Sequence, residues 1–200
     1  MKLYYYPDAC SLVVNIALRA ANIPFDLIEV DYASRQLRDG SDFSKINAKA
    51  YVPALVLDDG SCLTEVIAIL DWIDFKAPKA ALLGLQGTTW RQEAMTWLVF
   101  VATEIHKSFS PLFRPNTPRE FLVPGQHHLK NRLSVIETQL TGRQYLCADT
   151  PNGADYYMYV MSRWICDSGL CTRDWPAIRA HANRIETLTY VQDALASDIR

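Results

Sequence analysis

The stretch KLYYYPDACSLVVNIALRA, residues 2–20, decides how the N-terminal part of this chain folds. A strand is expected at residues 2–6 and a helix at residues 11–21, joined by a Pro-Asp-Ala turn. Cys10 stands where the helix begins. The first N–H groups of a helix are unpaired and carry the positive end of its dipole, so they stabilise a thiolate. Cys10 is therefore the leading candidate for chemistry.

Working outward, the next segments alternate in the same way. The peptide between Val52 and Pro53 precedes a strand, and an X-Pro bond is the one that readily adopts the cis form. The expected order reads β-α-β, then β-β-α: strands at 2–6, 25–31, 54–57 and 62–63, helices at 11–21 and 65–75, a polar stretch up to residue 47 and a turn at 58–61.

Composition restricts the possible functions. The chain has 200 residues, half of them hydrophobic, enough for a sizeable core in one large or two small domains. Its net charge is −2, with 20 basic and 22 acidic residues scattered along the chain, so we expect no nucleic acid partner. No apolar stretch approaches the roughly 20 residues that cross a bilayer, and the start is too short for a secretory signal. A cytoplasmic protein without membrane contact is expected.

The cysteines indicate reduced thiols. They number five and show neither a C-x-x-C pair nor the paired spacing of a zinc site. We therefore expect no metal centre. The cysteines are Cys10, Cys62, Cys147, Cys166 and Cys171.

The hydrophobic period changes after residues 79–87, a linker that contains Gly84 and Gly87. We therefore expect one domain at 1–78 and a second, helical domain at 88–200. Apolar residues recur at three- and four-residue steps in two amphipathic helices of the second domain. Prolines are expected to break the chain between these helices, at Pro111, Pro115 and Pro118.

A helix start is also visible later in the chain. Asn152 and Asp155 precede the apolar run 156–164 with the spacing of a capping box, in which each residue satisfies N–H groups at the helix start. Their expected role is structural. Gly169 is expected to end that helix, and two shorter helical segments are expected to follow.

Together these segments resemble the glutathione S-transferase family, specifically its bacterial, cysteine-containing beta class. The resemblance covers nearly the whole chain and is specific through the order and spacing of its motifs. It implies an α+β fold, with a thioredoxin-like N-terminal domain (βαβ-ββα) followed by an all-α C-terminal domain, in a homodimer. The residues that carry the resemblance are 1–7, 9–12, 52–60, 63–65, 103–109 and 111–115.

The resemblance implies an enzyme that conjugates glutathione, its cosubstrate, to hydrophobic electrophiles in detoxification. A second activity is thiol-disulfide exchange, in which Cys10 forms a mixed disulfide with glutathione. The implied catalytic residues are Cys10 and His106, with Lys107 alongside. A neighbouring cation and a helix N-terminus lower a thiol pKa from about 8.5 toward roughly 3.5–7.5. Tyr5 and Ser11 are secondary candidates for contact with sulfur, because other transferase classes use Tyr or Ser.

The same resemblance implies how glutathione is held. Glu65 pairs with the γ-glutamyl ammonium, and the N–H of Val66 holds the adjacent carboxylate. Val52 offers its backbone to the cysteinyl amide, with a cis Pro53 fixing the direction. Arg35, in the segment 32–44, either clamps the glycine carboxylate or is a solvated surface residue. Further implied contacts come from Thr103, Glu104, His106 and Lys107.

Other side chains are given a structural role. His127, His128 and His181 are expected at the surface. Aromatic residues at helical spacing are more often core than pocket wall, so Tyr157, Trp164 and Phe113 receive no assignment. The electrophile is not identified by the sequence.

Several positions depart from the family pattern. Val66 stands where relatives have Gly or Ser, Asp8 where they have Gly, and Ala50 in place of the Gly before Val-Pro. A negative charge at Asp8 opposes a thiolate at Cys10 unless it faces water. The alternative hypothesis is therefore a non-catalytic relative, a binding or regulatory protein whose glutathione site has drifted.

Overall fold

The structure is a computed structural model that describes residues 1–31 and 33–198. The chain packs as two units. The first contains Met1–Leu82 together with the chain from Leu188 onward, and the second contains Leu83–Thr187. Tyr32, which opens the predicted segment 32–44, lies outside the described residues.

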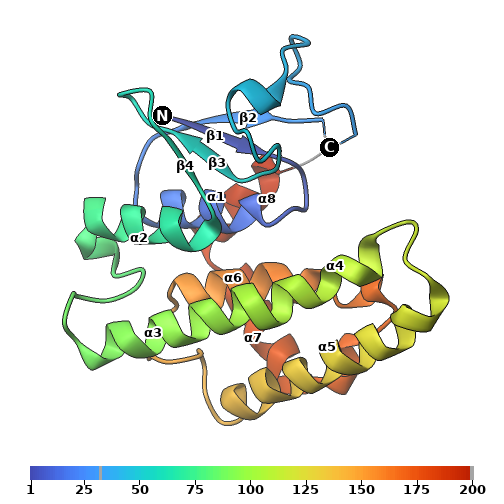
Figure 1. Ribbon diagram of the computed structural model, residues 1–200. Helices are drawn as coiled ribbons and strands as arrows, with labels where there is room; N and C mark the ends of the chain where they lie inside the picture. The colour runs from blue at the N-terminus through green and yellow to red at the C-terminus, as the bar shows by residue number, and fades with distance from the viewer. Residues whose placement is uncertain (32, 199–200) are drawn as a thin grey trace. The chain divides into compact units, whose positions relative to one another are not determined.

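The first unit is a small sheet with helices on one face (Figure 1). The sheet order is β2-β1-β3-β4, with β1 parallel to β2 and antiparallel to β3, and β3 antiparallel to β4. Its elements are β1 (Lys2–Tyr5), α1 (Ser11–Ala20), β2 (Asp26–Glu29), η1 (Phe43–Lys45), β3 (Ala54–Val56), β4 (Cys62–Thr64), α2 (Val66–Lys76), η2 (Pro78–Ala80) and α8 (Thr189–Ser197).

The core of this unit forms around β1 and α1. β1 is a central strand, so its side chains are covered on both faces: Leu3 is fully buried and Tyr4 is 7% exposed. Every side chain of α1 from Ser11 to Leu18 is buried, because the helix packs against the sheet, α2 and α8. On the other side of the sheet, Tyr4 stacks near Phe43 with ring centroids 5.6 Å apart.

The turn between β1 and α1 is closed by backbone bonds. Ala9 N–H donates to the Tyr6 carbonyl at 3.1 Å, and the Ser11 hydroxyl donates to the same carbonyl at 3.3 Å. Asp8 has a φ of 59°, which explains why relatives place glycine here. Its N–H donates to Asp198 at 2.8 Å, which ties the turn to the end of α8.

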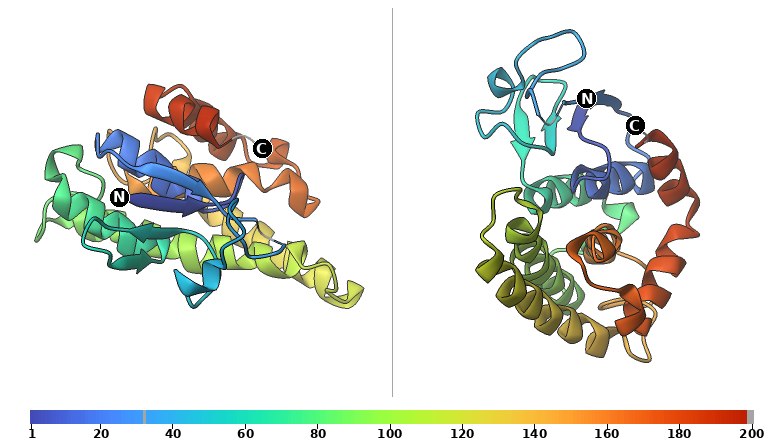
Figure 2. Two further views of the ribbon diagram at one scale, coloured as in Figure 1. Left: turned by 90° about the horizontal axis from the view of Figure 1, so that it is seen from above. Right: turned by 90° about the vertical axis from the view of Figure 1, so that its right-hand side faces the viewer.

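The second unit is entirely helical among its described elements. α6 packs against α3, the adjacent π-helical segment and α7, and it is buried along nearly its whole length. The right-hand view of Figure 2 shows α6 nearly end-on. The elements are α3 (Thr89–Phe100), the π-helix η3 (Val101–His106), α4 (Lys107–Phe113), α5 (Arg119–Leu140), α6 (Gly153–Arg163), η4 (Cys166–Ser168), η5 (Thr172–Asp174) and α7 (Pro176–Glu186).

The buried start of α6 confirms the predicted capping box. The Asn152 side chain accepts from the N–H of Ala154, and Asp155 accepts from the N–H of Asn152 at 3.0 Å. Asp155 also accepts from the N–H of Leu146 at 2.8 Å and contacts His181 Nε2 at 2.9 Å. The prediction that His181 lies at the surface is therefore wrong. It is 1% exposed, because its ring is the partner of a buried carboxylate.

The observed elements confirm the predicted fold class. The strands and helices predicted in residues 2–75 end within one or two residues of the observed ones. Three details differ. α6 ends at Arg163, and Gly169 caps the short η4 turn beyond it instead. Pro111 lies inside α4, and the chain leaves the helix only after Phe113. The predicted first helix of the C-terminal part contains the π-helical segment η3 between α3 and α4.

The packing units also differ from the predicted chain division, because α8 lies against α1. By chain position α8 belongs to the C-terminal part, whereas by packing it belongs to the first unit. The division of the chain into domains at residues 1–78 and 88–200 remains a proposal. His127 and His128 are exposed, as predicted. Within residues 1–31 and 33–198, no helix combines the length and the apolar character that crossing a membrane requires.

A test of the backbone follows from Ala50, whose φ is 54°. The left-handed conformation costs an L-residue about 1–2 kcal/mol, while glycine adds about 0.4–1 kcal/mol of unfolded-state entropy. Ala50→Gly is thus expected to raise the free energy of unfolding by about 0.5–1 kcal/mol, measured by urea denaturation. Ala48→Gly is the matched control two residues earlier, without a positive φ, and should lower it. Equal effects from both variants would contradict the assigned backbone conformation.

Candidate functional site

The predicted site residues divide between the two units. Cys10, Arg35, Val52, Glu65 and Val66 belong to the first unit. Thr103, Glu104, His106 and Lys107 belong to the second.

Cys10 is the N-cap residue of α1, as predicted for a thiol at a helix start. Its side chain is half-buried and does not cap the helix. Instead, Sγ donates to the Val52 carbonyl at 3.6 Å. A thiolate cannot donate this bond, so ionisation releases Cys10 from Val52 while the positive end of the α1 dipole favours the sulfur anion. The Ser11 hydroxyl is occupied by the backbone of Tyr6.

Val52 lies two residues before the first residue of β3. The Val52–Pro53 peptide is cis, as predicted, and Pro53 is buried. The carbonyl of Val52 accepts from the Cys10 sulfur, so this sulfur lies between the start of α1 and the residues that lead into β3. The sequence placed these two residues 42 positions apart, and the sheet brings them together.

Glu65 is the N-cap residue of α2 and has a φ of 70°. Its side chain makes no capping bond and is exposed. The carboxylate instead pairs with Lys49 at 2.7 Å, and Lys49 also donates to Thr64 at 2.8 Å. This pairing raises the pKa of Lys49. Val66, which follows Glu65, is 6% exposed, so its side chain packs into the unit while its N–H lies in the first turn of α2.

Lys49 was not predicted as a site residue. The available signal was the lysine that this chain keeps between Ala48 and Ala50, where relatives have an Asn-Pro-Lys-Gly-Gln segment. An ion pair between residues 16 positions apart has no periodic signature, so only the folded chain reveals it.

Arg35 lies in a loop that is more ordered than its polar sequence suggests. Its φ is 59°, its N–H donates to Asp31 at 2.9 Å, and its carbonyl accepts from the buried Phe43 at 3.0 Å. The guanidinium donates to the carbonyl of Ala50. Arg35 therefore contacts the segment that leads to Val52, and it is half-buried.

In the second unit, the π-helical segment contains three of the four predicted residues: Thr103, Glu104 and His106. Hydroxyls bond to carbonyls four residues back at both ends of this segment: Thr103 to Val99 at 3.0 Å and Ser108 to Glu104 at 2.5 Å. Glu104 pairs with Arg132 on α5 at 3.0 Å. Short π-helical turns are frequent at functional sites, and hydrophobic periodicity does not predict them.

His106 ends the π-helical segment and is surrounded by aromatic rings. Its Nδ1 lies 2.6 Å from the hydroxyl of Tyr157. Its ring centroid is 5.7 Å from that of Tyr157 and 5.2 Å from that of Trp164, both in edge-on geometry. Trp164 also contacts Phe109 and Phe113. The aromatic residues left unassigned by the sequence thus form the surroundings of His106. Lys107, which follows it, is exposed.

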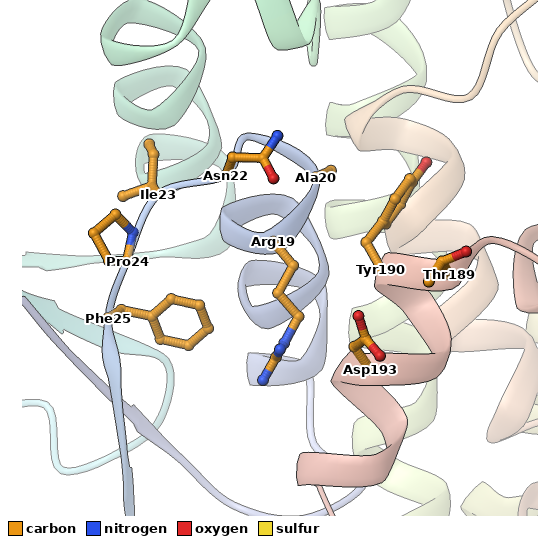
Figure 3. A pocket seen from close by; sticks show the side chains of 9 residues that line it. All are labelled: Arg19, Ala20, Asn22, Ile23, Pro24, Phe25, Thr189, Tyr190 and Asp193. Carbon is orange, nitrogen blue, oxygen red and sulfur yellow. The ribbon is translucent and has the colours of Figure 1, made fainter.

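A separate hollow of about 810 Å³ lies in the first unit, where the end of α1 and the following loop face α8 (Figure 3). Its lining includes Arg19, Phe25 and Tyr190 but none of the predicted site residues. Arg19 is held over the Phe25 ring at 5.6 Å and donates to Asn15 at 2.8 Å. The hollow therefore does not belong to the predicted site.

Neither a metal-binding cluster nor a disulfide bond is found among the described residues. No group of three or more His, Cys, Asp or Glu side chains within residues 1–31 and 33–198 is placed to hold a metal ion. All five cysteines are described, and none forms a disulfide.

Comparisons with known proteins define the class. Residues 9–75 match the family model of the glutathione S-transferase N-terminal domain, and residues 100–188 match that of the C-terminal domain. The chain belongs to the glutathione S-transferase family.

Individual relatives resemble the chain over its full length. Glutathione S-transferase GstA of Escherichia coli O157:H7 is 36% identical over 198 residues, which cover 99% of this chain and 98% of that protein. A sphingomonad glutathione S-transferase complexed with glutathione is 37% identical with a TM-score of 0.94, covering 99% and 98% of the two chains. The bacterial beta class enzyme of Sphingomonas chungbukensis is 36% identical, with the same TM-score and coverage. The predicted family and its beta class are confirmed.

The thiols other than Cys10 are expected to differ in reactivity. Arg173 donates to the Sγ of Cys171 at 3.3 Å and lowers its pKa. Burial raises the pKa of Cys62, and burial followed by the charge of Asp155 raises the pKa of Cys147 to about 12. Since only thiolates alkylate, iodoacetamide between pH 7 and 8 should modify Cys171 several times faster than Cys62, and Cys147 only after unfolding.

Peptide mass spectrometry against labelling time measures this order. Arg173→Gln is the matched control: it should slow the labelling of Cys171 and leave that of Cys62 unchanged. Labelling of Cys147 in the native protein as fast as Cys171 would contradict the assigned environments.

Proposed function

We propose that this protein is a glutathione S-transferase that conjugates glutathione to hydrophobic electrophiles. The observation that carries the proposal is the placement of the Cys10 sulfur at a helix start, 3.6 Å from the carbonyl that precedes the cis Pro53. The full-length similarity to a transferase complexed with glutathione supports it. These similarities favour the enzyme over the non-catalytic alternative.

In this proposal the first unit binds the peptide. Glu65 pairs with the γ-glutamyl ammonium, and the N–H of Val66 in the first turn of α2 holds the adjacent carboxylate. Val52 bonds the cysteinyl amide through its backbone. Arg35 supplies the positive charge that suits the remaining carboxylate.

In the same proposal Cys10 and His106 serve the sulfur chemistry, with Thr103, Glu104 and Lys107 as further contributors from the second unit. The glutathione thiolate attacks the electrophilic carbon, and the leaving group departs with the electron pair of the broken bond. In the exchange reaction, the thiolate of Cys10 attacks the sulfur of a glutathione mixed disulfide, and the partner leaves as a thiolate. Placement of Cys10 at the N-cap of α1 favours this second activity.

A homodimer in the cytoplasm with a role in detoxification completes the proposal. The resemblance to the family supports the dimer and the role, and five cysteines without a disulfide suit a reducing compartment. Light scattering during gel filtration tests the dimer, and a single-chain mass would contradict it.

Calorimetric titration with glutathione tests the proposed function, followed by assays with a chlorodinitrobenzene-type electrophile and a glutathione mixed disulfide. We expect binding and both activities. Cys10→Ala should abolish the exchange reaction and leave the protein able to bind glutathione. Absence of binding at millimolar glutathione would refute the proposal.

The carboxylate of Glu65 is expected to contribute directly to glutathione binding. Glu65→Gln keeps the shape of the side chain and removes its charge, so the ammonium of glutathione loses a charge-assisted bond worth about 1.5–3 kcal/mol. We expect the dissociation constant of glutathione to rise by about tenfold or more. Glu29→Gln, on an exposed position of β2 in the same unit, removes the same charge and should leave the constant unchanged. Equal effects would indicate a general electrostatic contribution.

Lys49 is expected to act in the opposite direction. Its ammonium pairs with the Glu65 carboxylate in the structure, so the ammonium of glutathione must displace the Lys49 side chain. Exposed ion pairs are worth about 0–1 kcal/mol, and Lys49→Met should therefore tighten glutathione binding by up to about fivefold. Weaker binding in this variant would indicate that Lys49 contacts glutathione itself.

A further inference from the structure

Tyr157 places a hydroxyl group against the ring of the predicted catalytic histidine. It is the fifth residue of α6 and is 3% exposed. Its hydroxyl oxygen lies 2.6 Å from Nδ1 of His106. The motifs of the chain assign no role to Tyr157, which by its spacing alone is a core residue.

The position of Tyr157 is fixed by the network at the start of α6. Asp155, two residues earlier, accepts from the N–H groups of Leu146 and Asn152 and contacts the buried His181. These bonds hold the first turn of the helix in place. The Tyr157 hydroxyl is therefore presented to His106 from a fixed support.

The bond geometry indicates which atom donates. N–H donors to oxygen are found at 2.7–3.2 Å, and hydroxyl donors form shorter bonds, with 2.5–3.0 Å as the range to oxygen acceptors. The observed 2.6 Å lies below the N–H···O range, as expected when the hydroxyl is the donor. A phenol is also a stronger acid than the N–H of a neutral imidazole, and an imidazole nitrogen is a stronger base than a phenol oxygen. The Tyr157 hydroxyl therefore donates, and Nδ1 of His106 accepts.

This direction decides the tautomer of the histidine. A neutral imidazole carries one proton, so an accepting Nδ1 places that proton on Nε2. The edge-on contacts with Tyr157 and Trp164 hold the ring plane as well. A histidine in this state offers an N–H donor at Nε2, which stabilises a sulfur anion, and it has no lone pair there to act as a base.

We propose that Tyr157 is a positioning residue that holds neutral His106 in its Nε2–H tautomer, so that His106 assists the reaction as a hydrogen-bond donor to the glutathione thiolate. The inference deepens the proposed function and rests on it for the identity of the sulfur anion. The tautomer itself follows from the second unit alone.

The first test is spectroscopic and needs no substrate. Nitrogen-15 NMR of histidine-labelled protein reports the tautomer, with His106→Gln identifying the signal. We expect the wild-type ring as the Nε2–H form and the Tyr157→Phe ring as a mixture of both tautomers. Tyr159→Phe is the matched control, since it removes a hydroxyl from the same helix that bonds Glu186 at 3.1 Å. An Nδ1–H tautomer in the wild type would overturn the proposal.

The second test is kinetic. Tyr157→Phe should lower kcat for conjugation by about tenfold and change the KM for glutathione by less than about twofold, because orientation in the transition state is lost and binding is not. Tyr159→Phe should retain the wild-type kcat. Equal losses in the two variants would assign Tyr157 a merely structural role and overturn the proposal.

Substitution of His106 separates a donor from a base. His106→Gln keeps an N–H donor at the position of Nε2, whereas His106→Leu keeps none. We expect the Gln variant to retain about tenfold more activity than the Leu variant, and the addition of Tyr157→Phe to change neither. Equal inactivity of both variants would indicate a base and contradict the proposed role. If glutathione does not bind the wild type, the proposed function fails while the NMR result still decides the tautomer.

Discussion

The first turn of a helix leaves N–H groups that need acceptors, and both units depend on how that need is met. At α6 the need is met by side chains: Asn152 and Asp155 cap the helix, and the buried His181 completes the network. At α1 and α2 the N-cap residues are Cys10 and Glu65, whose side chains make no capping bond. The capping residues of α6 support the fold, whereas the side chains of Cys10 and Glu65 turn to other partners, the Val52 carbonyl and Lys49.

This contrast has an energetic cost. A capping residue contributes about 0.5–2 kcal/mol of stability, which α1 and α2 forgo. The turn before α1 recovers part of it through backbone bonds and through the N–H of Asp8, which donates to Asp198. The end of α8 thus supports the turn that presents Cys10.

Much of the fold follows from local patterns. The strand and helix order, the cis Val52–Pro53 peptide and the capping box at Asn152 are each expressed within a few residues, so the sequence predicts them. The π-helical segment that ends at His106 inserts no visible break in the periodicity. The Lys49–Glu65 pair and the burial of His181 depend on partners distant in sequence, and only tertiary packing brings these together.

The backbone conformation bears on the positions that depart from the family pattern. Of the six described non-glycine residues with positive φ, four are Asp8, Arg35, Ala50 and Glu65. All four lie in or beside the segments from which the sequence predicts glutathione contacts. Two of them, Asp8 and Ala50, stand where the family resemblance implies glycine, and both adopt the left-handed conformation that glycine would allow. Such residues cost about 1–2 kcal/mol each and persist only where the surrounding structure imposes them. The fold therefore imposes these turns, and the backbone holds Cys10, Val52 and Glu65 in place even where neighbouring side chains depart from the family pattern.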